Sequence, residues 1–215
     1  ERQLLRDTLG RDGTFVDIGA NVGIYTLTAA THLGSRGRIV ALEPNPPAYQ
    51  RLCFNLNATK ASAGEWPRID ALELGVGDVA EERDLHLDPA NLGGSSIAGP
   101  AGSPLLRAVD GTGVVRVRCK PLLAILDEIG VRRVDALKID IEGAEDLALC
   151  PFLAQADDDR LPQRMVIENS EHLWQRDLLG ALRQRGYRVE LRTHMNTVYL
   201  REPDADTGRT APAVA

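Results

Sequence analysis

A glycine-rich turn that carries one acid lies between the first β-rich run of the chain and the first helical pattern. Its residues Asp17, Gly19, Asn21 and Gly23 are candidates for holding a nucleotide-type ligand. Glycine lets a backbone turn tightly and approach a ligand, and the helix that follows presents unpaired N–H groups. The glycines are spaced G-x-x-x-G rather than the G-x-G-x-x-G of dinucleotide sites, and Asp17 would repel a pyrophosphate. An acid at this place suits a ligand that carries an ammonium group.

Two further acids stand where a nucleoside would need them. Glu43 closes the second β-rich run, twenty residues after Gly23, where doubly wound nucleotide folds keep a carboxylate for the ribose hydroxyls. Asp78 follows Gly77 in the turn after the third run and could accept a hydrogen bond from an adenine amine, although Gly-x-Gly-Asp is also an ordinary turn. S-adenosylmethionine is a nucleoside with an ammonium group, so these positions favour it as the cofactor. The alternative is a strand-to-helix turn without a ligand.

Acids and one histidine also follow the fourth and fifth runs, at the edge where open α/β sheets bind ligands. Asp140 and Glu142 would share a face if the fourth strand continued that far, and could orient an acceptor, act as a base or hold a cation. Glu168, Asn169 and His172 come after the fifth run. His172 is an alternative base, because a histidine ordinarily titrates at about pH 6.5. Hard cations take carboxylates, but the sequence does not demand a metal.

The runs that must position these groups alternate with helical patterns from residue 14 to about residue 185. Strands are predicted at 14–18, 38–42, 69–74, 134–139 and 164–167. Helices are predicted at about 22–33, from Pro46 to about 56, and at about 121–129, 144–152 and 173–185. This order predicts a parallel sheet with right-handed crossovers. Two alternating strands at 187–191 and 196–200 predict an antiparallel finish.

The middle and the end of the chain are less regular. Alternating strands at 84–87 and 114–118 flank a stretch rich in Gly, Ser and Pro, residues 89–113. A loop of this length tends to be functional or disordered, and we predict that it borders an acceptor pocket and is ordered or closed by ligand. Residues 1–202 are expected to form one domain, and residues 203–215 a disordered tail.

Composition limits the classes of partner. The 215 residues are 43% hydrophobic and 26% charged with a mean hydropathy of −0.19, which is typical of a globular protein, and no apolar run approaches the ~20 residues that span a bilayer. The net charge is −6 without a basic block, which argues against nucleic acid. Three widely spaced cysteines indicate neither a disulfide framework nor a zinc site, and they favour a cytoplasmic location.

Together these segments resemble the FkbM family of S-adenosylmethionine-dependent methyltransferases. The resemblance runs from about residue 14 to about residue 200 and rests on four motifs: Asp17-Ile18-Gly19-Ala20-Asn21-Val22-Gly23, Leu42-Glu43-Pro44-Asn45-Pro46, Gly75-Val76-Gly77-Asp78 and Lys138-Ile139-Asp140-Ile141-Glu142-Gly143-Ala144-Glu145. The first motif is typical of class I methyltransferases in general, and the last narrows the likeness to this family.

The resemblance implies a Rossmann-like, doubly wound α/β sheet of seven strands in the order 3-2-1-4-5-7-6, with the last strand antiparallel. It implies O-methylation of a hydroxyl on a small-molecule acceptor, such as a secondary metabolite or a sugar. The cofactor would be held by Asp17, Gly19, Asn21, Gly23, Glu43, Asn45, Gly77, Asp78 and Asp140. The candidate catalytic residues are Asp140, Glu142 and His172. Candidate acceptor-binding residues are Glu168, Asn169, Ser95 and Ser96, the serines matching a Gly-Gly-Ser-like segment in which Ile97 replaces the usual leucine.

Other hypotheses remain open beside this one. A nicotinamide-dependent oxidoreductase is disfavoured by the glycine spacing and by Asp17, whereas a catalytically silent adenosine-binding domain of a biosynthetic assembly keeps the same motifs. Amine and base methyltransferases usually carry Asn/Asp-Pro-Pro-aromatic after the fourth strand, where this chain has Asp140-Ile141-Glu142. The segment Asn45-Pro46-Pro47-Ala48 follows the second strand and lacks the aromatic residue. Aromatic residues are 4% of the chain, which favours an aliphatic or glycosidic hydroxyl as acceptor.

Overall fold

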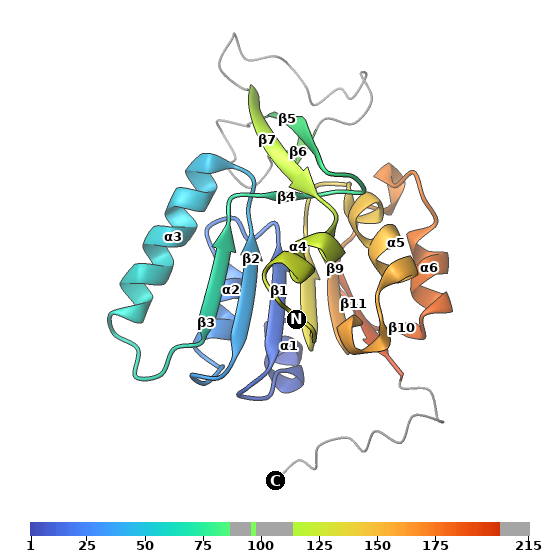
Figure 1. Cartoon of the computed structure of the whole chain (residues 1–215). Helices are drawn as coiled ribbons and strands as arrows, with labels where there is room; N and C mark the ends of the chain where they lie inside the picture. The colour runs from blue at the N-terminus through green and yellow to red at the C-terminus, as the bar shows by residue number, and fades with distance from the viewer. Residues whose placement is uncertain (87–95, 98–113, 203–215) are drawn as a thin grey trace.

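The sheet predicted from the alternating runs lies at the centre of the molecule (Figure 1). The computed structural model describes residues 1–86, 96–97 and 114–202. Its large sheet consists of β3 (Arg68–Leu72), β2 (Arg38–Leu42), β1 (Thr14–Ile18), β8 (Ala136–Ile139), β9 (Arg164–Glu168), β11 (Asn196–Arg201) and β10 (Tyr187–Arg192), in that order. Numbered along the chain within this sheet, the order is 3-2-1-4-5-7-6, and the seventh strand is antiparallel to both neighbours. The predicted fold class is therefore confirmed.

Helices cover both faces of this sheet, which is why its central strands are apolar on both sides. One face packs against α1 (Arg2–Thr8), α2 (Ile24–Ala30) and α3 (Pro46–Lys60). The other packs against α4 (Leu122–Glu128), α5 (Glu145–Gln155) and α6 (Leu178–Gln184). In β1, Phe15 contributes to the first layer, whereas Val16 and Ile18 contribute to the second. Each such buried side chain stabilises the fold by about 1.5–3 kcal/mol, so burial fixes the register that places the strand ends.

Two helical segments differ from the predictions. The first ten residues had no predicted element, and they contain α1, whose Leu5 is buried against the sheet. The helix predicted at about 173–185 is separated from its predicted start: a 3-10 turn, η2 (Glu171–Leu173), ends where it was expected to begin, and α6 starts only at Leu178. This later start has a local cause: the Asp177 side chain accepts a hydrogen bond from the Gly180 N–H at 2.8 Å and so caps α6, as aspartates favour at helix starts. Another 3-10 turn, η1 (Asp158–Arg160), precedes β9.

A second sheet, which the sequence did not reveal, lies above the carboxyl ends of the central strands (Figure 1). It consists of β4 (Gly75–Val76), β7 (Val114–Lys120), β5 (Glu81–His86) and β6 (Ser96–Ile97), in that order. The strands predicted at 84–87 and 114–118 pair antiparallel with each other as β5 and β7. Most of the predicted closing loop, 89–113, and the predicted tail, 203–215, lie outside the described residues, so both remain predictions.

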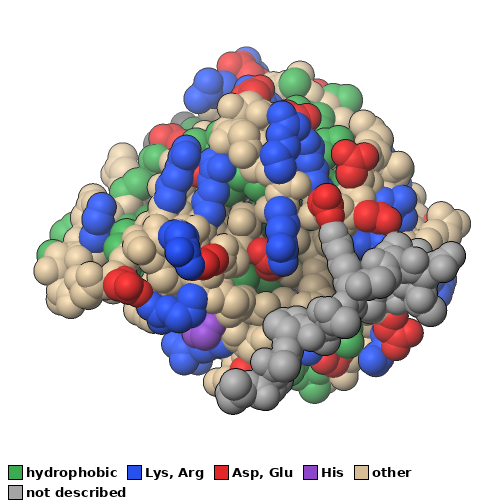
Figure 2. Space-filling model, turned by 60° about the horizontal axis from the view of Figure 1, so that its bottom comes forward, with side chains coloured by type: hydrophobic (Ala, Val, Ile, Leu, Met, Phe, Trp, Pro, Cys, Tyr) green, Lys and Arg blue, Asp and Glu red, His purple; other side chains and the backbone are tan. Residues whose placement is uncertain are grey.

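Arginines gather at the opposite edge, where the amino ends of the strands lie. Figure 2 turns this underside forward and shows Lys and Arg side chains interspersed with Asp and Glu. Arg38, at the start of β2, pairs with Asp70 at 2.8 Å, and Arg133 pairs with Asp135 at 2.6 Å. These arginines therefore have acidic partners within the fold. None of the helices in the described ranges has the length and apolar character needed to cross a membrane.

Candidate cofactor and active site

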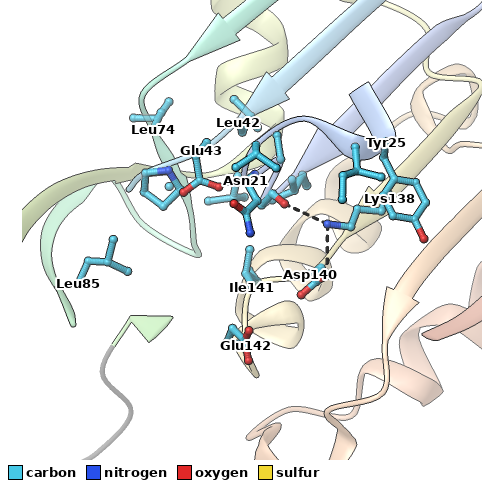
Figure 3. A pocket seen from close by; sticks show the side chains of 18 residues that line it. Asn21, Tyr25, Leu42, Glu43, Leu74, Leu85, Lys138, Asp140, Ile141 and Glu142 are labelled. Atoms are coloured by element: carbon cyan, nitrogen blue, oxygen red, sulfur yellow. Dashed lines mark hydrogen bonds and ion pairs between the residues drawn. The ribbon is translucent and has the colours of Figure 1, made fainter. Parts of the chain in front are cut away.

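A pocket opens at the carboxyl edge of the large sheet, beneath the second sheet (Figure 3). Its walls come from the turn after β1, the start of α2, the end of β2, residues 74–76, Leu85 of β5, Lys138 and residues 140–142. Four of the predicted cofactor-binding residues line it: Gly19, Asn21, Glu43 and Asp140. The other five, Asp17, Gly23, Asn45, Gly77 and Asp78, lie outside its lining, and their contact with the cofactor remains a prediction.

The turn after β1 needs the residues that the sequence places there. Gly19, Asn21 and Gly23 all have positive φ angles, of 72°, 51° and 95°. A Cβ on Gly19 would lie 2.0 Å from the main-chain oxygen of Asp140, and a Cβ on Gly23 would lie 2.7 Å from the Leu52 side chain. The turn therefore packs directly against the end of β8, and no larger residue fits at Gly19 without moving the backbone.

Glu43 stands at the pocket wall and holds the same turn. Its Oε2 accepts a hydrogen bond from the Asn21 N–H at 2.7 Å, and its Oε1 accepts one from the Asn45 N–H at 2.8 Å. The residue is only 6% exposed, and burial raises the pKa of its carboxyl despite these bonds. Each carboxylate oxygen can accept a second hydrogen bond. Glu43 is thus able to bind a pair of ligand hydroxyls while it fixes the turn.

Asp17, which the sequence assigns to a ligand ammonium, is wholly buried beneath the pocket. Its Oδ2 accepts a hydrogen bond from the Thr26 hydroxyl at 2.5 Å, and its Oδ1 lies 3.9 Å from Nζ of Lys138. Burial raises the pKa of Asp17, and the Lys138 charge opposes that rise. The ammonium group closest to this acid is therefore one that the protein itself supplies.

Lys138 is the residue that sequence reasoning missed. It lies on β8 directly opposite Asp17 of β1 in the parallel register, and it lines the pocket while being only 4% exposed. Its Nζ donates to the carbonyl oxygen of Gly19 at 3.0 Å and lies 3.4 Å from Oδ2 of Asp140 (Figure 3). The sequence did contain a signal for it: Lys138 is the charged residue of an otherwise apolar strand. A lysine in such a strand needs a buried counter-charge nearby.

Charged side chains hold the turn after β4. Asp78 pairs with Arg83 at 3.0 Å and with Arg176, which precedes α6, at 2.5 Å. The adjacent Gly77 donates its N–H to the carbonyl of Lys120. Because Asp78 and Gly77 lie outside the pocket lining, their predicted contact with adenine remains a prediction, and the residues that reach the pocket here are Leu74, Gly75 and Val76.

Three carboxylates predicted for chemistry come together beside the pocket. Oxygen atoms of Asp140, Glu142 and Glu168 all lie within 4.8 Å of one another; we call this group the carboxylate cluster. Strand alternation would place Asp140 and Glu142 on one face only if the strand continued that far, and β8 ends at Ile139. Glu142 instead reaches the cluster through a turn in which its own φ is 56°.

Two acids of the carboxylate cluster have raised pKa values. Burial, and then the negative charges of Asp140, Glu142 and Glu145, raise the pKa of Glu168 to about 8. Burial and the charge of Asp140 also raise the pKa of Glu142. Carboxylates this close repel each other when all are charged, so one of them tends to keep its proton. The same three carboxylates could also bind a hard cation. The cluster can therefore take up and release a proton near neutral pH.

Glu145 builds the turn that carries this cluster. Its Oε1 accepts from the N–H groups of Ile141 at 2.9 Å and Gly143 at 3.3 Å. Its Oε2 accepts from the Ser170 hydroxyl at 2.5 Å and from the Trp174 indole at 2.9 Å. These four bonds join the ends of β8 and β9, so this wholly buried acid supports the turn in addition to starting α5.

The remaining predicted residues are His172, Asn169, Ser96 and Ser95. His172 is exposed in η2, and it does not belong to the carboxylate cluster. The Asn169 side chain donates to the carbonyls of Thr193 and His194 and accepts from Thr197, so it braces the turn between β10 and β11. Ser96 is described only as part of β6, and Ser95 lies outside the described residues.

A family model and two curated relatives match most of this chain's length. The methyltransferase FkbM domain matches residues 17–189. The methyltransferase sdnD of Sordaria araneosa is 31% identical over 152 residues, which cover 60% of this chain and 56% of that protein. The AMB antimetabolite synthetase AmbE of Pseudomonas aeruginosa is 27% identical over 162 residues, covering 62% of this chain and 7% of AmbE. This chain thus spans about half of the one relative and a small part of the other.

Solved structures share the fold at low sequence identity. A methyltransferase FkbM from Methylobacillus flagellatus has a TM-score of 0.52 at 20% identity, over 88% of this chain and 44% of that one. A protein described as an rRNA methylase from Clostridium thermocellum has a TM-score of 0.56 at 10% identity, over 95% and 94% of the two chains. At these identities the likeness concerns the fold alone.

Proposed function

The chain belongs to the FkbM methyltransferase family, and on that premise we propose that it transfers a methyl group from S-adenosylmethionine to a hydroxyl group of a small-molecule acceptor. The observation that carries the proposal is the adjacency of the Gly19 turn and Glu43 to the carboxylate cluster. One side of this pocket suits a nucleoside, and the other suits removal of a proton. The match to AmbE, a synthetase by name, supports a setting in small-molecule biosynthesis.

The pocket has the features that this cofactor requires. Gly19 and Asn21 line the pocket, so a ligand can approach the backbone of the turn there. Glu43 offers two carboxylate oxygens for ribose hydroxyls. When bound, the cofactor supplies a methyl group on a positively charged sulfur, and the acidic lining formed by Glu43, Asp140 and Glu142 suits that charge.

The chain's own contribution to the reaction is alignment and proton removal. Methyl transfer is an in-line displacement, so the acceptor oxygen must be held opposite the sulfur. A hydroxyl becomes a better nucleophile as a base takes its proton. Asp140 lines the pocket and adjoins Glu142 and Glu168, so we assign proton acceptance to Asp140 with its two neighbours as reservoir. His172 is the comparison residue because it lies outside this group.

The acceptor atom can be tested with a labelled cofactor. Incubation with S-adenosylmethionine carrying a deuterated methyl group, and with matched alcohol, amine and carboxylic acid forms of several scaffolds, should label alcohols, as read by mass spectrometry. Labelling of amines in preference to alcohols would contradict the proposal. Cofactor binding without labelling of any acceptor, in an extended panel, would favour the silent adenosine-binding domain.

Replacing Glu43 by Ala should weaken S-adenosylmethionine binding by about tenfold or more, because each charge-assisted hydrogen bond contributes about 1.5–3 kcal/mol. Calorimetric titration measures the change. Glu73→Ala is a matched control, since Glu73 is exposed just beyond β3 and outside the pocket. Unchanged affinity in Glu43→Ala would remove the ribose assignment.

The rate of methyl transfer should rise with pH up to about 8 and then level off. The reason is that Glu168, whose pKa is raised to about 8, holds a proton below that pH and makes the cluster a weaker proton acceptor. Single-turnover rates from pH 6 to 9 give the profile, and Glu168→Gln, which cannot ionise, should flatten it. A wild-type profile that is already flat over this range would contradict the role of the cluster.

A further inference from the structure

Lys138 brings a positive charge into an otherwise acidic pocket. Among the described residues that line the pocket, it is the only lysine or arginine, whereas Glu43, Asp140 and Glu142 are all acids. Its neighbours along β8, Leu137 and Ile139, are fully buried. A lysine at such a position loses most of its hydration and is rarely placed there without a polar partner.

Partners within the protein hold the ammonium group from several sides. Nζ donates to the Gly19 carbonyl at 3.0 Å, Oδ2 of Asp140 lies 3.4 Å away, and Oδ1 of Asp17 lies 3.9 Å beneath. The ring of Tyr25 lies 5.4 Å from Nζ, within the range of a cation–π contact. An ammonium group has three N–H donors, and the Gly19 bond uses one of them in good geometry.

The charges of the cofactor call for two kinds of partner. S-adenosylmethionine carries an ammonium group and a sulfonium, which suit acids, and also a carboxylate, which suits a cation. The acids that line the pocket repel that carboxylate, and Asp17 is wholly buried beside Lys138. Lys138 is the lining side chain whose charge complements the carboxylate.

We propose that Lys138 recognises the carboxylate of the amino-acid portion of S-adenosylmethionine, so that the pocket distinguishes ligands that carry this group from ligands that lack it. The inference rests on the proposed function and adds a specificity residue to it. The same ammonium holds the Gly19 carbonyl, so recognition of the carboxylate and the shape of the cofactor turn depend on one side chain.

The test compares two ligands that differ by the carboxylate alone: S-adenosylmethionine and its decarboxylated form. The variant is Asp17→Asn with Lys138→Met, which removes the buried pair together and leaves the net charge of the site unchanged. Both ligands use the Gly19 turn that Lys138 holds, so the affinity for S-adenosylmethionine should fall by about tenfold or more beyond any fall in the affinity for the decarboxylated ligand. Lys138→Arg, which keeps the charge, should retain the preference of the wild type.

Calorimetry gives the affinities, and a melting curve shows that each variant is folded. Lys120→Met is the matched control, because Lys120 pairs with Glu128 at 2.7 Å and lies outside the pocket lining. Equal weakening of both ligands, or unchanged binding of S-adenosylmethionine, would overturn the inference alone. Failure of the wild type to bind either ligand would overturn the proposed function and the inference with it.

Discussion

Asp140→Asn is expected to lower the rate of methyl transfer by a factor of about 10²–10⁴, the usual contribution of a positioned acid or base. The amide keeps the shape of the side chain but cannot accept the proton of the acceptor hydroxyl. Much of the cofactor affinity should remain, because Glu43 and the Gly19 turn are untouched. The measurement is the single-turnover rate with a true acceptor, beside a melting curve that excludes misfolding.

His172→Ala is the comparison variant for this prediction. His172 is exposed and stands apart from the carboxylate cluster, so its loss should cost far less than the loss of the Asp140 charge. The two losses need not add if both groups serve one step. An Asp140→Asn enzyme that turns over at the parent rate would contradict the assignment and move the base to Glu168 or His172.

Lys138→Met is expected to destabilise the fold by about 3–5 kcal/mol, because it leaves the buried Asp17 carboxylate without its counter-charge. The side chains of Asp17 and Lys138 are 1% and 5% exposed, so water cannot replace the lost partner. Urea unfolding, extrapolated to zero denaturant, measures the difference. Lys120→Met, at a partly exposed pair, should cost only a fraction of this amount.

The loss of stability in Lys138→Met should depend on pH through the ionisation of Asp17. Burial already raises the pKa of Asp17 in the folded state, so the folded protein holds this proton to higher pH than the unfolded chain does. The stability contributed by Asp17 is therefore lost as pH rises, and the deficit of Lys138→Met should shrink as pH falls toward about 4. Adding Asp17→Asn should restore most of the stability. A double variant as unstable as the single one would contradict this explanation.

The large sheet could be predicted because its strands follow a simple rule. Five short apolar runs alternate with helix-length patterns, and this alternation dictates parallel pairing with crossovers. The second sheet could not be predicted in the same way. Its strand β4 has two residues, and its pairing of β5 with β7 joins segments on either side of a long insertion. Nothing in local periodicity specifies such a partner.

The sequence predicted those pocket residues whose position depends only on the strand and turn that carry them. Gly19 and Glu43 fall in the pocket lining because the turn after β1 and the end of β2 are dictated by the fold. Lys138 was missed because its role depends on Asp17 of the neighbouring strand. The ion pair of Asp78 with Arg176 could not be predicted either, because Arg176 lies far along the chain. Both ion pairs join residues that are far apart in the sequence, so local patterns do not reveal them.

The most direct test of the account is calorimetric titration of the wild-type chain with S-adenosylmethionine, S-adenosylhomocysteine and NAD. The family and the pocket predict saturable binding of the first two ligands at one site, competition between them, and no binding of NAD. Competition would show that the methylated and demethylated cofactors share the pocket formed by Gly19, Glu43 and Asp140. Binding of NAD, or no binding of S-adenosylmethionine by the folded protein, would contradict the account.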